Sequence, residues 1–77
     1  MLTEKGAWMV VCIMRDHKQE IVMETEDERE AVEIYKKAAE AVRAGSAPFN
    51  CAILKYRYAK KPGESARYKC VRLSFGD

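Results

Sequence analysis

Lysine, arginine and tyrosine residues are concentrated in the C-terminal half of the chain. These residue types can bind phosphate groups. In the stretch KYRYAKK, residues 55–61, cations alternate with aromatic or small residues. Surfaces that bind single-stranded nucleic acids combine cations, which contact the backbone, with a ring on which a base stacks. Cations also keep an exposed sheet face soluble and discourage association of its edges, so a solvated face is the alternative interpretation. The predicted binding residues are Lys55, Arg57, Lys60, Lys61, Tyr68 and Arg72.

The same side chains raise the question of catalysis. Small ribonucleases can cleave RNA with cations and a tyrosine that stabilise the charge developing at phosphorus. Lys55, Arg57, Tyr68 and Arg72 have these types, but no general base is evident beside them. A ribonuclease therefore ranks last among the functions considered, and we expect no catalytic residues.

Other chemistry finds little support in the residue types. His17 is the only histidine and falls in an expected turn, while Cys12 is expected in the core, so no nucleophile and base are paired. The chain has three cysteines, Cys12, Cys51 and Cys70. Their odd number and the lack of CxxC spacing argue against a disulfide framework and against a zinc site. Glycine-rich nucleotide-binding motifs are absent from the sequence. We expect neither a metal nor a cofactor.

Two strands should form the N-terminal part. The segment Trp8–Met14, WMVVCIM, is apolar at every position, as in a strand buried on both faces. A polar turn at residues 15–19 separates it from an alternating strand at residues 20–24. A loop of His17 and Lys18 would place Met14 opposite Ile21 and bring Ile21 into the core.

A helix should follow from residue 26 to residue 44. Thr25 and Glu28 have the spacing of a capping box, and Gly45 suits a left-handed C-cap. Capping and the helix dipole explain the acidic residues of this segment better than a metal or acid–base site does. The expected buried stripe is Ala31, Ile34, Tyr35, Ala38, Ala41 and Val42.

The remaining chain should form a second hairpin, with strands at residues 50–59 and 65–75. Pro62-Gly63 suits a type II turn. If Lys61 and Glu64 flank this turn, the resulting register pairs Leu54 with Val71. This register predicts one face beneath the helix and one cationic face. The helix-side set is Ala52, Leu54, Tyr56, Tyr58, Val71, Leu73 and Phe75, and the other set is Ile53, Lys55, Arg57, Tyr68, Cys70 and Arg72.

The order β-β-α-β-β places the chain in the α+β class, as one small domain of residues 1–77. A right-handed crossover lets the third strand dock beside the first, which gives a four-stranded antiparallel sheet of order 2-1-3-4. One helix covers one face, and the other face lacks a cover. A contiguous apolar patch on a small domain marks a contact surface, and two-fold dimers are the commonest oligomers. The predicted homodimer interface is Met9, Val11, Ile13, Val22 and Ile53.

Charge is unevenly distributed although the net value is only +2. Residues 1–40 carry a net charge of −4 and residues 41–77 a net charge of +6. Such asymmetry fits complementary charges on a partner, which steer association and give specificity. No apolar run reaches the ~18 residues that a membrane span needs, and the N-terminus lacks a signal-peptide pattern, so we expect a cytoplasmic protein. We expect a non-enzymatic homodimeric binding module for a protein partner, with nucleic acid as the alternative and a small ligand between the subunits still open.

Overall fold

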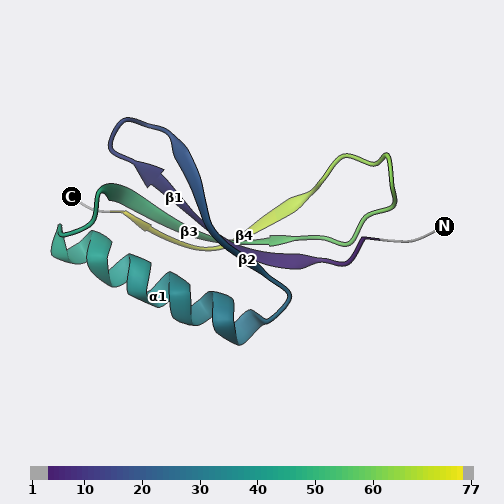
Figure 1. Cartoon of the computed structure of the whole chain (residues 1–77), viewed down its shortest axis with the longest axis horizontal. Helices are drawn as coiled ribbons and strands as arrows, with labels where there is room; N and C mark the ends of the chain where they lie inside the picture. Colours follow the sequence, from purple (N-terminus) through teal and green to yellow (C-terminus); the bar gives the residue numbers. More distant parts are fainter. Residues whose placement is uncertain (1–3, 76–77) are drawn as a thin grey trace.

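The all-apolar segment near the N-terminus forms strand β1, which lies in the middle of a four-stranded antiparallel sheet (Figure 1). The structure is a computed structural model that describes residues 4–75. Its sheet order is β2-β1-β3-β4, and α1 packs against one face, so the predicted β-β-α-β-β fold is confirmed. The elements are β1 (Ala7–Met14), β2 (Gln19–Thr25), α1 (Glu28–Ala44), β3 (Phe49–Arg57) and β4 (Tyr68–Phe75).

Helix α1 begins two residues later than the capping-box pattern predicts. Asp27 is the N-cap, and its side chain accepts a hydrogen bond of 3.0 Å from the backbone N–H of Arg29. The Thr25 hydroxyl accepts from the backbone N–H of Asp27 at 3.1 Å, so it closes the turn before the helix. The C-terminal prediction is confirmed, because Gly45 adopts a left-handed φ of 72° and donates to the Val42 carbonyl oxygen.

The main core lies between α1 and the two central strands. The fully buried side chains Val10, Cys12 and Leu54 project from β1 and β3 toward the helix. Small residues dominate the facing side of α1, which lets the helix approach the sheet closely. Ile34 and Ala41 are only half-buried, and Tyr58, predicted for the core, is exposed. The buried helix residues are Ala31, Tyr35, Ala38, Ala39 and Val42.

The β1–β2 hairpin differs from the predicted register. Its loop has three residues, because the backbone N–H of Met14 donates to the Lys18 carbonyl oxygen at 2.8 Å. His17 takes the left-handed conformation, with φ of 70°, that a glycine would occupy more readily. Counted from this loop, Ile21 lies opposite Val11, and a one-residue shift at Val22 follows, after which Met23 pairs with Val10. Ile21 therefore lies on the face away from α1, and its predicted place in the core is wrong.

The β3–β4 hairpin follows the predicted register only next to its loop. Lys55 pairs with Cys70 as predicted, but a one-residue shift at Val71 then pairs Leu54 with Arg72 instead of Val71. This β-bulge reverses the faces of the rest of β4. Arg72 and Ser74 turn toward the helix, and Leu73 and Phe75 turn away from it, which corrects the predicted face assignment.

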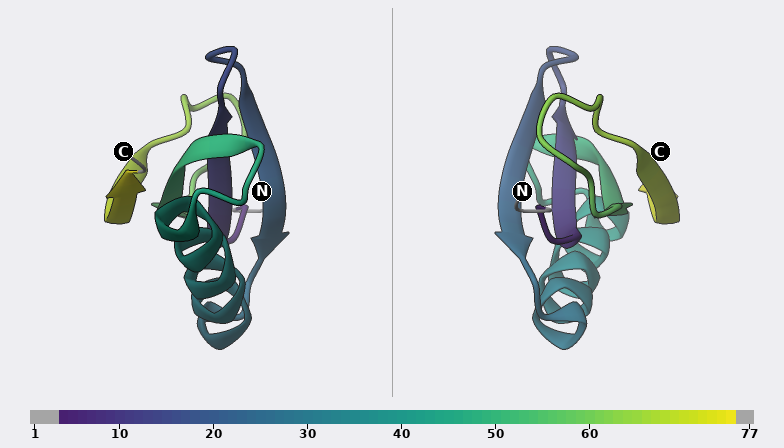
Figure 2. Two further views of the ribbon diagram at one scale, coloured as in Figure 1. Left: turned by 90° about the vertical axis from the view of Figure 1, so that its left-hand side faces the viewer. Right: turned by 90° about the vertical axis from the view of Figure 1, so that its right-hand side faces the viewer.

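The face of the sheet opposite α1 is open in residues 4–75. Figure 2 shows α1 along one face, with no helix or strand of the described chain stacked over the other. The loops of both hairpins bend away from the helix (Figure 1). We call this surface the open face.

The position of the helix cap can be tested by mutation. Asp27→Ala removes the acceptor for the Arg29 N–H and should lower the free energy of unfolding by about 1 kcal/mol. Thr25→Ala, the matched control, should cost less because its hydroxyl lies outside the helix. Chemical denaturation measures both changes, and a larger loss for Thr25→Ala would contradict this assignment of the cap.

Candidate interaction surface on the open face

The strand register places apolar side chains in rows across the open face. Directly paired residues share a face, so each row contributes neighbouring side chains from successive strands. The first row contains one apolar residue from every strand, and the second ends in Phe75 at the β4 edge. We call the apolar residues of these rows the apolar band: Ile21, Val11, Ile53 and Leu73 in the first, and Ile13, Cys51 and Phe75 in the second, in which the β2 position is the polar Gln19.

The centre of the apolar band is buried and its edges are exposed. Val11 and Ile53 are only 3% and 8% exposed, although no helix or strand within residues 4–75 covers them. They pack with Met9 and Cys51 in a second cluster, beside the half-buried Ile13. The residues at the two edges, by contrast, remain in contact with solvent: Ile21 is 58% exposed, Leu73 46% and Phe75 69%.

The predicted dimer residues therefore occupy different situations. Met9, Val11 and Ile53 are buried within the single chain, while Val22 is exposed at the β2 bulge. The sequence pattern predicts positions on the helix side for Ile21, Leu73 and Phe75, the strongly exposed members of the band, and this prediction is wrong. Neither bulge carries a glycine or another sequence signal, so the missed residues had no local pattern that would identify them.

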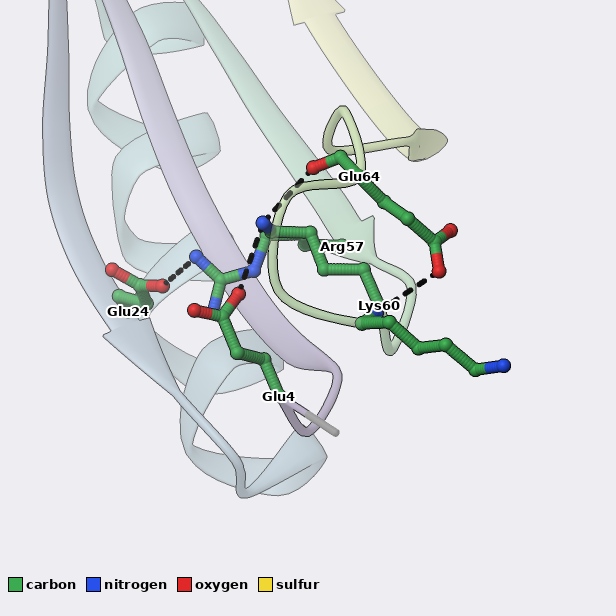
Figure 3. A network of polar contacts seen from close by, with 6 residues as sticks. Glu4, Glu24, Arg57, Lys60 and Glu64 are labelled. Carbon is green, nitrogen blue, oxygen red and sulfur yellow. Dashed lines mark hydrogen bonds and ion pairs between the residues drawn. The ribbon is translucent and has the colours of Figure 1, made fainter. Parts of the chain in front are cut away.

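Acidic residues neutralise two of the predicted binding cations. Arg57 Nη1 on β3 lies 2.6 Å from Glu24 Oε1 on β2, so this ion pair spans the intervening strand β1 (Figure 3). Lys60 Nζ lies 3.2 Å from Glu4 Oε2 and donates to the Glu64 carbonyl oxygen at 3.0 Å (Figure 3). A short bridge between the backbones of Glu4 and Lys60 ties the N-terminal segment to the β3–β4 loop. These contacts direct both cations toward the protein itself.

The other predicted binding residues do not form a single cationic surface. Lys55 Nζ lies 5.8 Å from the centre of the Tyr68 ring, a distance typical of a cation–π contact. Tyr68 is half exposed and pairs with Arg57 at the polar end of the open face. Lys61 is exposed in the loop, while Arg72 lies on the helix side of the sheet. The structure thus brings together Lys55, Arg57 and Tyr68 and separates the rest.

The cysteines differ in burial. Cys12 lies in the core under α1, and burial raises the pKa of its thiol, with smaller contributions from Cys51 and Glu20. Burial also raises the pKa of Cys51, and Cys70 adds to this shift. Cys70 itself is exposed on β4. Within residues 4–75, no group of three or more histidine, cysteine or acidic side chains is placed to hold a metal ion.

Thiol reactivity should follow this difference. A disulfide reagent at pH 8 in dilute native protein should modify Cys70 quickly, and Cys12 and Cys51 slowly, because burial limits access and a raised pKa lowers the thiolate fraction. Cys70→Ser should abolish the fast phase in an absorbance assay, whereas Cys51→Ser should retain it. A fast phase that survives Cys70→Ser would contradict the burial of the other thiols.

Comparison with known proteins gives no relative from which a function can be transferred. No protein-family model, curated protein or solved structure matches the chain. The helix found in residues 4–75 is neither long enough nor apolar enough to cross a membrane. Inference about function therefore depends on the surfaces of this chain alone.

Proposed function

We propose that this protein is a non-enzymatic interaction module that forms a homodimer through the apolar band and binds a protein partner as an accessory factor. The observation that carries the proposal is the row Ile21–Val11–Ile53–Leu73, which crosses all four strands and is exposed at both ends. A monomer gains nothing by exposing apolar side chains at both edges of one row. Their burial against another surface would be favourable, at roughly 25 cal/mol for each Å² removed from water.

A second copy of the chain fits this surface for a physical reason. Arg57 and Glu24 already satisfy each other at the polar end, and the first row of the band carries no charge. An uncharged apolar patch is complementary to itself, and a two-fold axis places the same patch on both subunits. The two sheets would pack face to face about 10 Å apart, as in sandwich structures.

The charged parts of the chain would remain available in such a dimer. The acidic first turn of α1 contains Glu28 and Glu30 and lies on the helix side of the sheet. The β3–β4 loop carries the exposed Lys61 beyond the end of the band. These two regions support recognition of a protein partner with complementary charge, which would increase the association rate and the specificity.

The dimer can be tested by measuring mass against concentration. Light scattering should give about twice the chain mass of 8.8 kDa at tens of micromolar. The double variant Ile21→Thr/Leu73→Thr should be monomeric and still folded, because it changes side chains that are exposed in the single chain. Its melting temperature should lose the concentration dependence expected of a dimer.

Tyr58→Thr is the matched control, since it removes a comparably exposed apolar side chain outside the open face. It should leave the mass unchanged. A wild-type monomer at tens of micromolar, or a dimer unaffected by the double variant, would contradict the proposed dimer.

The nucleic-acid alternative rests on the pair of Lys55 and exposed Tyr68. Since Glu24 neutralises Arg57, we expect no binding of a single-stranded oligonucleotide at about 50 mM salt, where phosphate contacts are strong. Fluorescence anisotropy at low and high salt measures this. Salt-sensitive binding that increases in Glu24→Gln, which releases Arg57, and disappears in Tyr68→Ala would favour nucleic acid over a protein partner.

A further inference from the structure

An open cavity of about 420 Å³ lies on the helix side of the sheet, between the C-terminal half of α1 and the edge strand β4. It is separate from the apolar band, which lies on the opposite face. Cations and hydroxyl groups dominate its lining. The polar side chains are Tyr35, Lys36, Glu40 and Arg43 from α1, and Arg72 and Ser74 from β4.

The β4 bulge creates the strand side of this cavity. Without the one-residue shift at Val71, the helix would face Val71 and Leu73, as the hydrophobic pattern predicts. The shift instead turns Arg72 and Ser74 toward α1 and exposes Leu73. Bulges commonly redirect a side chain in this way, and they occur often near functional sites. An arginine thus takes a position at which an apolar side chain would pack against the helix.

The helix side of the cavity follows from helical spacing. Lys36, Glu40 and Arg43 are separated by four and three residues, which places them on one face of α1. With Arg72, the lining carries three cations and one carboxylate, a net charge of +2. None of these cations takes part in the ion pairs formed within residues 4–75, whereas Arg57 and Lys60 each have a carboxylate partner.

Two hydroxyl groups add a directional donor. Tyr35 Oη and Ser74 Oγ are 2.7 Å apart, and either can donate to the other. One hydrogen is used in this bond, so the second hydroxyl hydrogen is available for a third group. The Tyr35 side chain is buried, which fixes the position of its hydroxyl.

We propose that this cavity binds the phosphate group of a small phosphate monoester. Such a group carries a charge of −1.5 to −2 near pH 7, which matches the net charge of the lining. Arg43 and Arg72 offer planar guanidinium groups that bind phosphate oxygens in pairs, Lys36 adds a third charge, and the hydroxyl pair donates to a further oxygen. The cavity volume lies in the range of small-molecule sites and leaves room for the organic part of the ligand.

The proposal can be tested with inorganic phosphate and glycerol 3-phosphate as probes at low ionic strength. Titration followed by amide NMR should give saturable shifts in the second half of α1 and in β4. Arg72→Gln should weaken binding by about tenfold or more, as expected for the loss of charged hydrogen bonds. Tyr35→Phe should weaken it less while preserving the buried ring, which keeps the test valid if Arg72→Gln is poorly folded.

Arg67→Gln is the matched control, because it removes an equal charge from the exposed β3–β4 loop. It should leave the affinity unchanged. Shifts that do not saturate, or equal losses for Arg67→Gln and Arg72→Gln, would show that phosphate responds only to overall charge and would overturn the proposal. The monomeric variant Ile21→Thr/Leu73→Thr should bind phosphate with unchanged affinity. The phosphate site and the dimer are therefore tested independently of each other.

Discussion

A single helix has to shield a four-stranded sheet, and this constraint governs the rest of the molecule. The buried side chains beneath α1 come from the two central strands, where Val10, Cys12, Ala52 and Leu54 meet the alanine-rich side of the helix. The edge strands receive much less cover, and nearly all of β4 is exposed. Both surfaces of interest follow from this arrangement. The open face carries the apolar band, whose edges are exposed to solvent. The cavity beside α1 is lined in part by Arg72.

The sequence predicted the fold through features that act locally. A short apolar segment rich in β-branched residues and with no polar position favours a central strand, and Gly45 marks the end of α1 by the conformation it adopts. The strand registers were harder to predict because the sequence pattern does not show where a register shifts by one residue within a strand. In β4 the apolar Leu73 alternates with the polar Ser74, and this pattern alone does not say which of the two faces the helix. In the structure Ser74 faces the helix and forms a hydrogen bond with Tyr35. That contact joins residues 39 positions apart, so no local pattern contains it.

The candidate site was predicted less well than the fold, for a related reason. The stretch from Lys55 to Lys61 contains four cations and no acidic residue, yet Glu24 and Glu4 come from distant segments to pair with Arg57 and Lys60. Counting cations along a string overestimates the positive potential of the surface when partners arrive from other strands. Tyr68 and Lys55 were correctly placed together because they lie where the predicted register holds. Beyond Val71 the same reasoning assigned Arg72 to the wrong face.

The bulges in the two outer strands also bear on how copies of this chain can associate. One interrupts β2 at Val22 and the other interrupts β4 at Val71, so each outer strand of the sheet is irregular. A regular outer strand offers an unbroken line of amide and carbonyl groups to which further chains can add without limit. An irregular one is a poor template for such growth. The proposed dimer, formed through the broad open face, would close after two copies and leave no free end for a fibre to extend.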